Sequence, residues 1–74
     1  MIKAQEEQAI EFISFCIENF KVNHKMTGKE VISLFSEKGV IDFLIEAYDI
    51  LHTQGKDYIL SEIELFLQKR GYIL

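Results

Sequence analysis

Tyr48, Asp49 and His52 are the residues of this 74-residue chain whose types and spacing suit acid–base chemistry. On a helix, residues three apart face the same side, so the Asp49 carboxylate comes within reach of the His52 imidazole, as a general base or half of a metal site requires. The simpler interpretation is that His52 bonds the free carbonyls at a helix end and Asp49 is a solvated surface acid. We favour this structural interpretation, because so short a chain is not expected to build a cleft of about 300 Å³.

A second histidine and a single cysteine complete the set of candidate reactive side chains. His24 has no acidic or thiol neighbour at metal-ligand spacing, so we expect it in a basic loop beside Lys25. Cys16 lies between Phe15 and Ile17 on an apolar helix face, where a cysteine behaves as a small buried hydrophobic residue. One cysteine excludes an intramolecular disulfide and fits a reducing, cytoplasmic location. We therefore predict no catalytic, cofactor-binding or metal-binding residue, and no enzyme.

The net charge of −4 is the wrong sign for a nucleic-acid surface, which needs Lys and Arg to replace counterions. A capped short helix, a glycine and a second helix give the outline of a helix-turn-helix motif, but the polar face of the second helix carries only Asp42, Glu46 and Asp49. No apolar run approaches the roughly 18 residues of a membrane span, and residues 1–7 lack the apolar core of a signal peptide. The sequence therefore predicts neither a nucleic-acid nor a membrane partner.

Helices are the regular structure that the spacing of apolar residues predicts. The chain has no proline, and its four glycines are spread evenly. Residues 1–74 should form a single all-α domain, a compact bundle of about four helices with short glycine-terminated connections, in which the third helix is the most central. The expected helices run from residue 3 or 4 to 22 or 23, from 28 to 38, from 40 or 43 to 54, and from 57 or 61 to 70.

Caps and glycines mark the expected helix ends. Thr27 and Glu30 have the spacing of a capping box at the start of the second helix. Gly39 follows the second helix and should adopt positive φ as a left-handed stop, while Gly55 and Gly71 should end the third and fourth helices. The predicted core residues follow the helical spacing of each segment: Ile10, Ile13, Ile17, Phe20, Val31, Ile32, Leu34, Phe35, Leu44, Tyr48, Leu51, Ile63, Phe66 and Leu67.

Two stretches, residues 9–20 and 40–51, carry more apolar surface than one core can cover. Their apolar residues sweep an arc of about 220°, against the roughly 100° that a surface helix needs. A 74-residue domain cannot easily bury both, so the excess predicts a partner: another protein, or a second copy in a homodimer. The function expected from the residues is a non-enzymatic interaction module. The residues predicted at its interface are Leu65, Tyr72, Leu74, Asp42, Glu46 and Asp49.

The order of caps, glycine stops and core residues over residues 11–20, 26–31, 39–43 and 51–55 resembles a family of short bacterial proteins known as a domain of unknown function. The resemblance covers nearly the whole chain, and its elements specify a fold better than an activity. Members of that family are encoded beside a larger protein that resembles an ADP-ribosyltransferase. The resemblance thus implies an alternative function, an antitoxin-like partner that neutralises such a toxin, and assigns no catalytic residue.

Overall fold

The computed structural model describes residues 4–73, with side chains from Glu7 onward, and in this range it contains helices and no strand. The predicted all-α class is therefore confirmed. The helices are α1 (Ala4–His24), α2 (Gly28–Lys38), α3 (Val40–Glu46), α4 (Tyr48–Leu51) and α5 (Lys56–Lys69).

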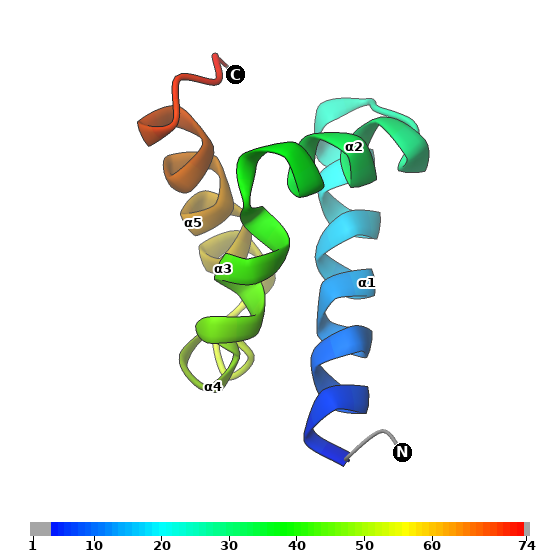
Figure 1. Ribbon diagram of the computed structural model, residues 1–74, viewed down its shortest axis with the longest axis vertical. Helices are drawn as coiled ribbons and strands as arrows, with labels where there is room; N and C mark the ends of the chain where they lie inside the picture. Colours follow the sequence, from blue (N-terminus) through cyan, green and yellow to red (C-terminus); the bar gives the residue numbers. More distant parts are fainter. Residues whose placement is uncertain (1–3, 74) are drawn as a thin grey trace.

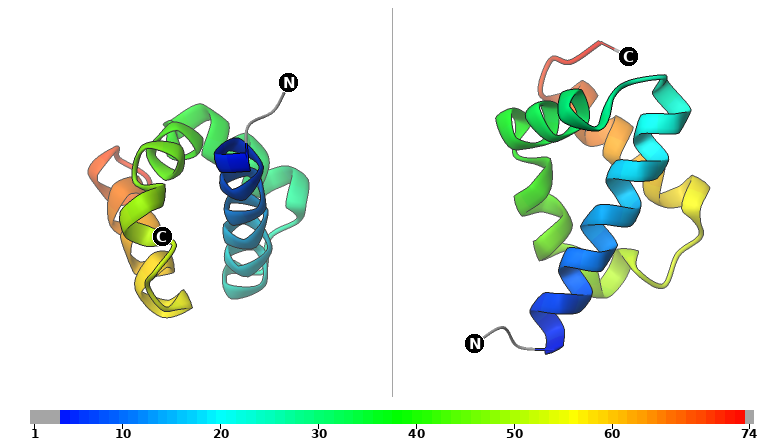
Figure 2. Two further views of the ribbon diagram at one scale, coloured as in Figure 1. Left: turned by 90° about the horizontal axis from the view of Figure 1, so that it is seen from below. Right: turned by 90° about the vertical axis from the view of Figure 1, so that its right-hand side faces the viewer.

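The helices wrap around α3, which contacts each of the other four. The long helix α1 and the last helix α5 lie on either side of α3, which runs between them, and α2 crosses one end of the molecule (Figures 1 and 2). The described part of the chain measures 36 × 23 × 21 Å. The expectation that the third predicted helix is the most central is met by its first half, α3.

One hydrophobic cluster holds the described helices together, and its fully buried members Phe20, Phe35, Leu44 and Ile63 come from four different elements. The prediction of which α1 residues lie in the core is partly wrong. Phe12, Cys16 and Phe20 face the core, whereas Ile10 is 53% exposed.

The α1 error has a physical cause in the wide apolar arc of this helix. When most of the circumference is apolar, the sequence does not fix which side turns inward. The prediction also fails for Ile32, which is 51% exposed on α2, while the neighbouring Val31, Leu34 and Phe35 are buried as expected.

The start of α2 has the predicted capping box. The Glu30 backbone N–H donates to Thr27 Oγ1 at 3.1 Å, and the Thr27 N–H donates to Glu30 Oε1 at 2.9 Å. The hydrogen bond from the Thr27 backbone, followed by that with the Thr27 side chain, lowers the pKa of Glu30 below its usual value. Two of the free N–H groups of the helix start are thereby satisfied.

Gly39 adopts the predicted left-handed conformation, with φ +78°. Its N–H donates to the Phe35 carbonyl, which closes α2, and its own carbonyl accepts from the Phe43 N–H at 3.1 Å, which opens α3. Of the two predicted starts of the third helix, the start at Val40 is therefore confirmed, and Asp42 is not a cap.

The single third helix predicted up to Gly55 is wrong, because the helix breaks at Ala47 into α3 and α4. Alanine is the best helix former, so local propensity gives no sign of this break, and it must come from packing. The second piece ends early, since His52 and Thr53 side chains bond the carbonyls of Tyr48 and Ile50.

Gly55 begins a helix rather than ending one. Its backbone is extended, with φ −71° and ψ 160°, and α5 starts at the next residue, Lys56. Both predicted starts, at residue 57 and at residue 61, are therefore too late. The early start places Ile59 and Leu60 on the same buried side as Ile63.

The first and last helices end in the same hydrogen-bond pattern. In α5, the Gly71 N–H bonds the Gln68 carbonyl and the Tyr72 N–H bonds the Leu67 carbonyl, as in a Schellman motif, and the predicted stop at Gly71 is confirmed. In α1, Lys25 takes the position of the glycine, with φ +55°. A lysine gives no sequence signal for such a stop.

We predict that Gly39→Ala lowers the free energy of unfolding by about 1–2 kcal/mol, because an L side chain is strained at this φ. An added Cβ meets no atom within 4 Å, so the loss would come from the backbone alone. Thermal melts should show a midpoint lower by roughly 4–8 °C per kcal/mol. Gly28→Ala is the control: its Cβ makes an ordinary 3.9 Å contact with Lys21, and the midpoint should stay level or rise. An unchanged midpoint for Gly39→Ala would contradict the assignment.

We predict the opposite sign for Lys25→Gly, since glycine relieves the strain of a left-handed lysine. The gain should be at most about 1 kcal/mol, because glycine also adds freedom to the unfolded chain. Lys29→Gly is the matched control within α2, where the same change should cost about 1 kcal/mol. If urea titrations give Lys25→Gly a lower free energy of unfolding than the unchanged chain, the turn tolerates lysine without strain.

Candidate functional site

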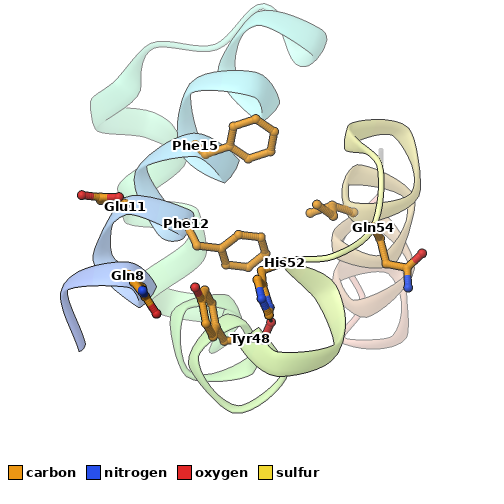
Figure 3. Close-up of a pocket in the computed structure, with 8 residues that line it drawn as sticks. Gln8, Glu11, Phe12, Phe15, Tyr48, His52 and Gln54 are labelled. Carbon is orange, nitrogen blue, oxygen red and sulfur yellow. The ribbon is translucent and has the colours of Figure 1, made fainter. Parts of the chain in front are cut away.

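A hollow of about 370 Å³ lies between α1 and the connection from α4 to α5 (Figure 3). This contradicts the expectation that the chain is too short for a cleft of this size. One wall comes from α1 and the other from residues 48–59. The lining residues are Gln8, Glu11, Phe12, Phe15, Tyr48, His52, Gln54 and Ile59.

A column of rings forms the inner wall of this hollow. The edge-to-face contact of Phe12 and Tyr48 has ring centroids 5.5 Å apart, and Tyr48 stacks on His52 at 4.3 Å with an angle of 7° between the rings. The helical spacing of four between Tyr48 and His52 puts the second pair on one face of α4. Figure 3 shows the Phe12 ring projecting from α1 towards this pair, and the Phe15 ring projecting from α1 further away from it.

The imidazole of His52 is fixed by the end of α4. Its Nδ1 lies 2.6 Å from the Tyr48 carbonyl oxygen, which also accepts the His52 backbone N–H at 2.9 Å, so the ring adds a second hydrogen bond to a carbonyl at the helix end. A carbonyl oxygen only accepts hydrogen bonds, so in the neutral ring Nδ1 carries the proton and Nε2 holds a lone pair. The exposed His52 ring therefore offers an acceptor.

The predicted acid–base trio is divided in the structure. Tyr48 and His52 line the hollow, whereas Asp49 does not, and Asp49 makes no hydrogen bond or ion pair with His52. Among the lining residues the carboxylate is that of Glu11, which Figure 3 shows turned away from Tyr48 and His52. The described part of the chain holds no cluster of three or more His, Cys, Asp or Glu side chains placed to bind a metal ion.

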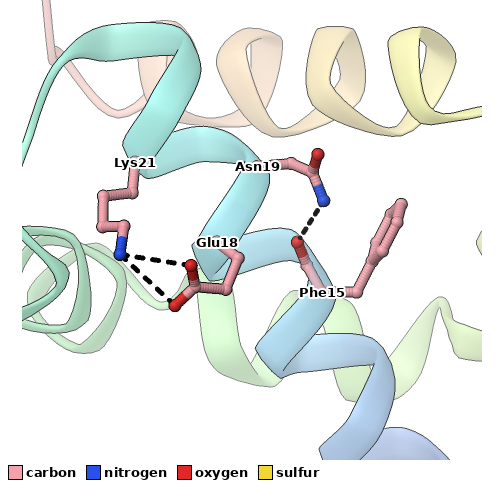
Figure 4. A network of polar contacts seen from close by, with 4 residues as sticks. All are labelled: Phe15, Glu18, Asn19 and Lys21. Carbon is pink, nitrogen blue, oxygen red and sulfur yellow. Dashed lines mark hydrogen bonds and ion pairs between the residues drawn. The ribbon is translucent and has the colours of Figure 1, made fainter.

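A smaller hollow of about 100 Å³ continues along α1 beyond Phe15. We call the two hollows together the α1–α5 groove. Phe15 is 42% exposed and Val22, two turns further along α1, is 73% exposed. Between them Asn19 is tied down by a 2.8 Å hydrogen bond from Nδ2 to the Phe15 carbonyl (Figure 4). The second hollow is lined by Asn19, Val22, Asn23, Lys56, Asp57 and Leu60.

The opposite side of α1 is polar and self-contained. Glu18 and Lys21 form an ion pair of 3.1 Å there, on the far side of the helix from Phe15 and Asn19 (Figure 4). An exposed pair of this kind contributes only a few tenths of a kcal/mol. The Glu18–Lys21 pair is therefore not among the residues that line the groove.

The closed end of the groove is held by a contact that the sequence did not reveal. His24 Nε2 lies 2.7 Å from Glu64 Oε2, and Asn23 Nδ2 donates to the same oxygen at 3.5 Å. The His24 ring also packs on Phe20. The expectation that His24 belongs to a basic loop without an acidic neighbour is wrong, because Glu64 is 40 residues away in sequence and no local pattern can indicate it.

The residues predicted at an interface do not gather on one surface. Leu65 is exposed beside a hollow that Phe43 and Phe66 also line, whereas Tyr72 is half-buried against the core and lines a different hollow beside α2. Leu74 lies outside the described residues. The remaining three, Asp42, Glu46 and Asp49, are exposed along α3 and α4, and none forms an ion pair with a described residue.

A family described as "Protein of unknown function (DUF3791)" matches residues 11–70, which is most of the chain. The chain belongs to this family. No curated protein and no solved structure matches it. The expected resemblance to a domain of unknown function is confirmed to that extent.

The matched part of this DUF3791 domain includes both walls of the α1–α5 groove except Gln8. Leu65 also falls inside it, and Tyr72 falls outside it. Within the described residues, no helix combines the length and the apolar character needed to cross a membrane.

Cys16 is fully buried, as predicted, and burial raises the pKa of its thiol from 9.0 to about 12. The pKa of this thiol is higher in the folded chain than in the unfolded chain, so below about pH 9 its titration does not lower the free energy of unfolding. Stability is lost as the pH rises from about 9 towards 12, where the unfolded chain releases the proton and the folded chain still holds it.

We predict that Cys16 of this DUF3791 domain resists a disulfide reagent at about pH 8 and reacts fully in denaturant, because thiolate is the reactive form and the folded chain contains very little of it. Labelling should then follow transient opening. The destabilised Gly39→Ala variant should label faster than the unchanged chain, and Gly28→Ala should not. Immediate and complete labelling of the folded chain would contradict the burial of this thiol.

Proposed function

We propose that this DUF3791 domain is a non-enzymatic interaction module that binds another protein through the α1–α5 groove. The observation that carries this proposal is the pair of exposed apolar side chains, Phe15 and Val22, seven residues apart on one face of α1, each lining one of two separate hollows. Isolated apolar residues on a surface are ordinary, but an aromatic residue at the edge of a pocket is typical of a binding hot spot.

The shape of the groove favours a helical or extended segment as its occupant. Grooves that receive helices contact anchors spaced by three, four or seven residues, and the residues of α1 that face the groove are spaced in the same way. Its inner wall is the stacked column of Phe12, Tyr48 and His52, which presents rigid rings at little entropic cost. The single reduced thiol supports a cytoplasmic location for this activity.

The test is the mass of the pure chain in solution and its co-purification with the protein encoded next to it. We expect Val22→Lys to abolish the complex, with a second copy or with that neighbour, because it places a charge on the exposed edge of the groove. Ile32→Lys is the matched control, since it makes the same change at an exposed isoleucine of α2 outside the groove.

Circular dichroism must show both variants folded. A complex that survives Val22→Lys but is lost in Ile32→Lys would move the interface to α2. A strict monomer that binds no neighbour would contradict the proposed function.

A second candidate, an antitoxin-like partner of an ADP-ribosyltransferase-like toxin in a bacterium, is supported by the family resemblance and by the acids Asp42, Glu46 and Asp49 on α3 and α4, which form no ion pair with a described residue. A small acidic protein can cover a basic surface of a larger one. Co-expression with the neighbouring protein should restore growth, and exchanging the three acids for their amides should weaken this rescue. Growth inhibition without any rescue would remove this candidate.

A further inference from the structure

We infer that the larger hollow of the α1–α5 groove binds the guanidinium group of an arginine side chain on the partner protein. This inference rests on the proposed function, since it names the chemistry of one contact in the groove. It follows from three features of the hollow: its charge, its acceptors and its rings.

The charge around the hollow favours a cation. Glu11 stands at its rim, Glu7 lies one turn earlier on α1, and no lysine or arginine is among the lining residues. Figure 3 shows the Glu11 carboxylate turned away from the rings, so Glu11 attracts a cation at the entrance rather than fixing it inside. Complementary charge of this kind selects the partner and speeds its approach.

The acceptors suit a group with several N–H donors. Nδ1 of His52 is committed to the Tyr48 carbonyl, so Nε2 presents a lone pair to the solvent side. Gln8 adds a side-chain amide at the edge of the hollow, whereas Figure 3 shows the Gln54 amide turned away from the rings. A guanidinium has five N–H donors and no acceptor, which matches this set better than a single hydroxyl or indole would.

The rings favour a planar cation over a compact one. Phe12, Tyr48 and His52 form a continuous column, and the half-exposed Phe15 ring stands at the same hollow (Figure 3). A guanidinium stacks flat on aromatic rings, whereas the ammonium of lysine is a strongly hydrated point charge. The volume of about 370 Å³ lies at the lower end of the range for ligand pockets and suits one side chain.

The probe for this site is N-acetyl-arginine amide, added to the isotope-labelled full chain and followed by NMR. We expect shifts at the amides of Phe15, His52 and Gln54 and at the His52 ring nitrogens. N-acetyl-citrulline amide has nearly the same shape without the charge, and it should bind roughly two- to fivefold more weakly, the factor of a partly exposed cation–π contact. The lysine derivative should also bind more weakly.

Two variants assign the effect to the hollow. His52→Phe keeps a stacked ring but removes the Nε2 acceptor, and it should weaken arginine binding. Glu11→Gln should do the same through the loss of charge, whereas Glu18→Gln, the same change two turns further along the same face of α1 and outside the lining of the hollow, should leave binding unchanged. The NMR spectrum of each variant reports directly whether it is folded.

Several outcomes would overturn the inference: citrulline binding as well as arginine, shifts caused only by N-acetyl-tryptophan amide, or no shifts in the hollow with any derivative. The tryptophan result would assign the hollow to an apolar anchor instead. Failure here is distinct from failure of the proposed function, which is judged by Val22→Lys and the mass of the complex. A chain that binds arginine but no protein would keep the site and lose the interaction module.

Discussion

The fold depends on one left-handed residue, Gly39, which joins α2 to α3 without a linker. Its N–H closes one helix and its carbonyl opens the next, so both helix ends are satisfied within a single residue. The residues whose packing depends on this turn, Phe35 and Val40, are fully buried. The turn therefore sets the direction in which α3 enters the core, and α3 is the element that contacts every other helix.

The position of α3 in turn separates α1 from α5. Where the two helices come together, the bond between His24 and Glu64 and the one from Asn23 hold them closed. Towards the other end of α1, the hollow of about 370 Å³ lies between α1 and the connection from α4 to α5. The early end of α4 at His52 makes this possible, because the chain then crosses to α5 as a loop whose residues line the hollow instead of filling it.

The sequence was informative wherever one residue type has one local reason to be present. The capping box at Thr27, the left-handed stops at Gly39 and Gly71 and the helix-end role of His52 all depend on neighbours within four residues, and all are confirmed. The break at Ala47 could not be predicted, because alanine favours a helix and the break follows from packing. The end of α1 at Lys25 could not be predicted either, because a lysine occupies the left-handed position that is usually a glycine.

For the candidate site, local sequence patterns indicated some of its residues but not which residues lie next to one another in the fold. Tyr48 and His52 were selected from their spacing, but their partners in the hollow, Phe12 and Phe15, come from α1 and were assigned only to a wide apolar arc. That arc was also the reason that Ile10 was wrongly placed in the core. Which side of α1 turns inward is decided by packing against α2, α3 and α5, and the local pattern within α1 does not contain this information.

The apolar surface of the groove is best understood as surplus that a short chain cannot bury. A domain of this size hides only about 60% of the surface of its unfolded chain, so some apolar area must remain outside. Here part of that area stands beside two hollows on one face of α1, where a partner can cover it in one step. A partner that binds only the folded state also stabilises it. Occupancy of the groove would therefore raise the small free energy of unfolding of this domain.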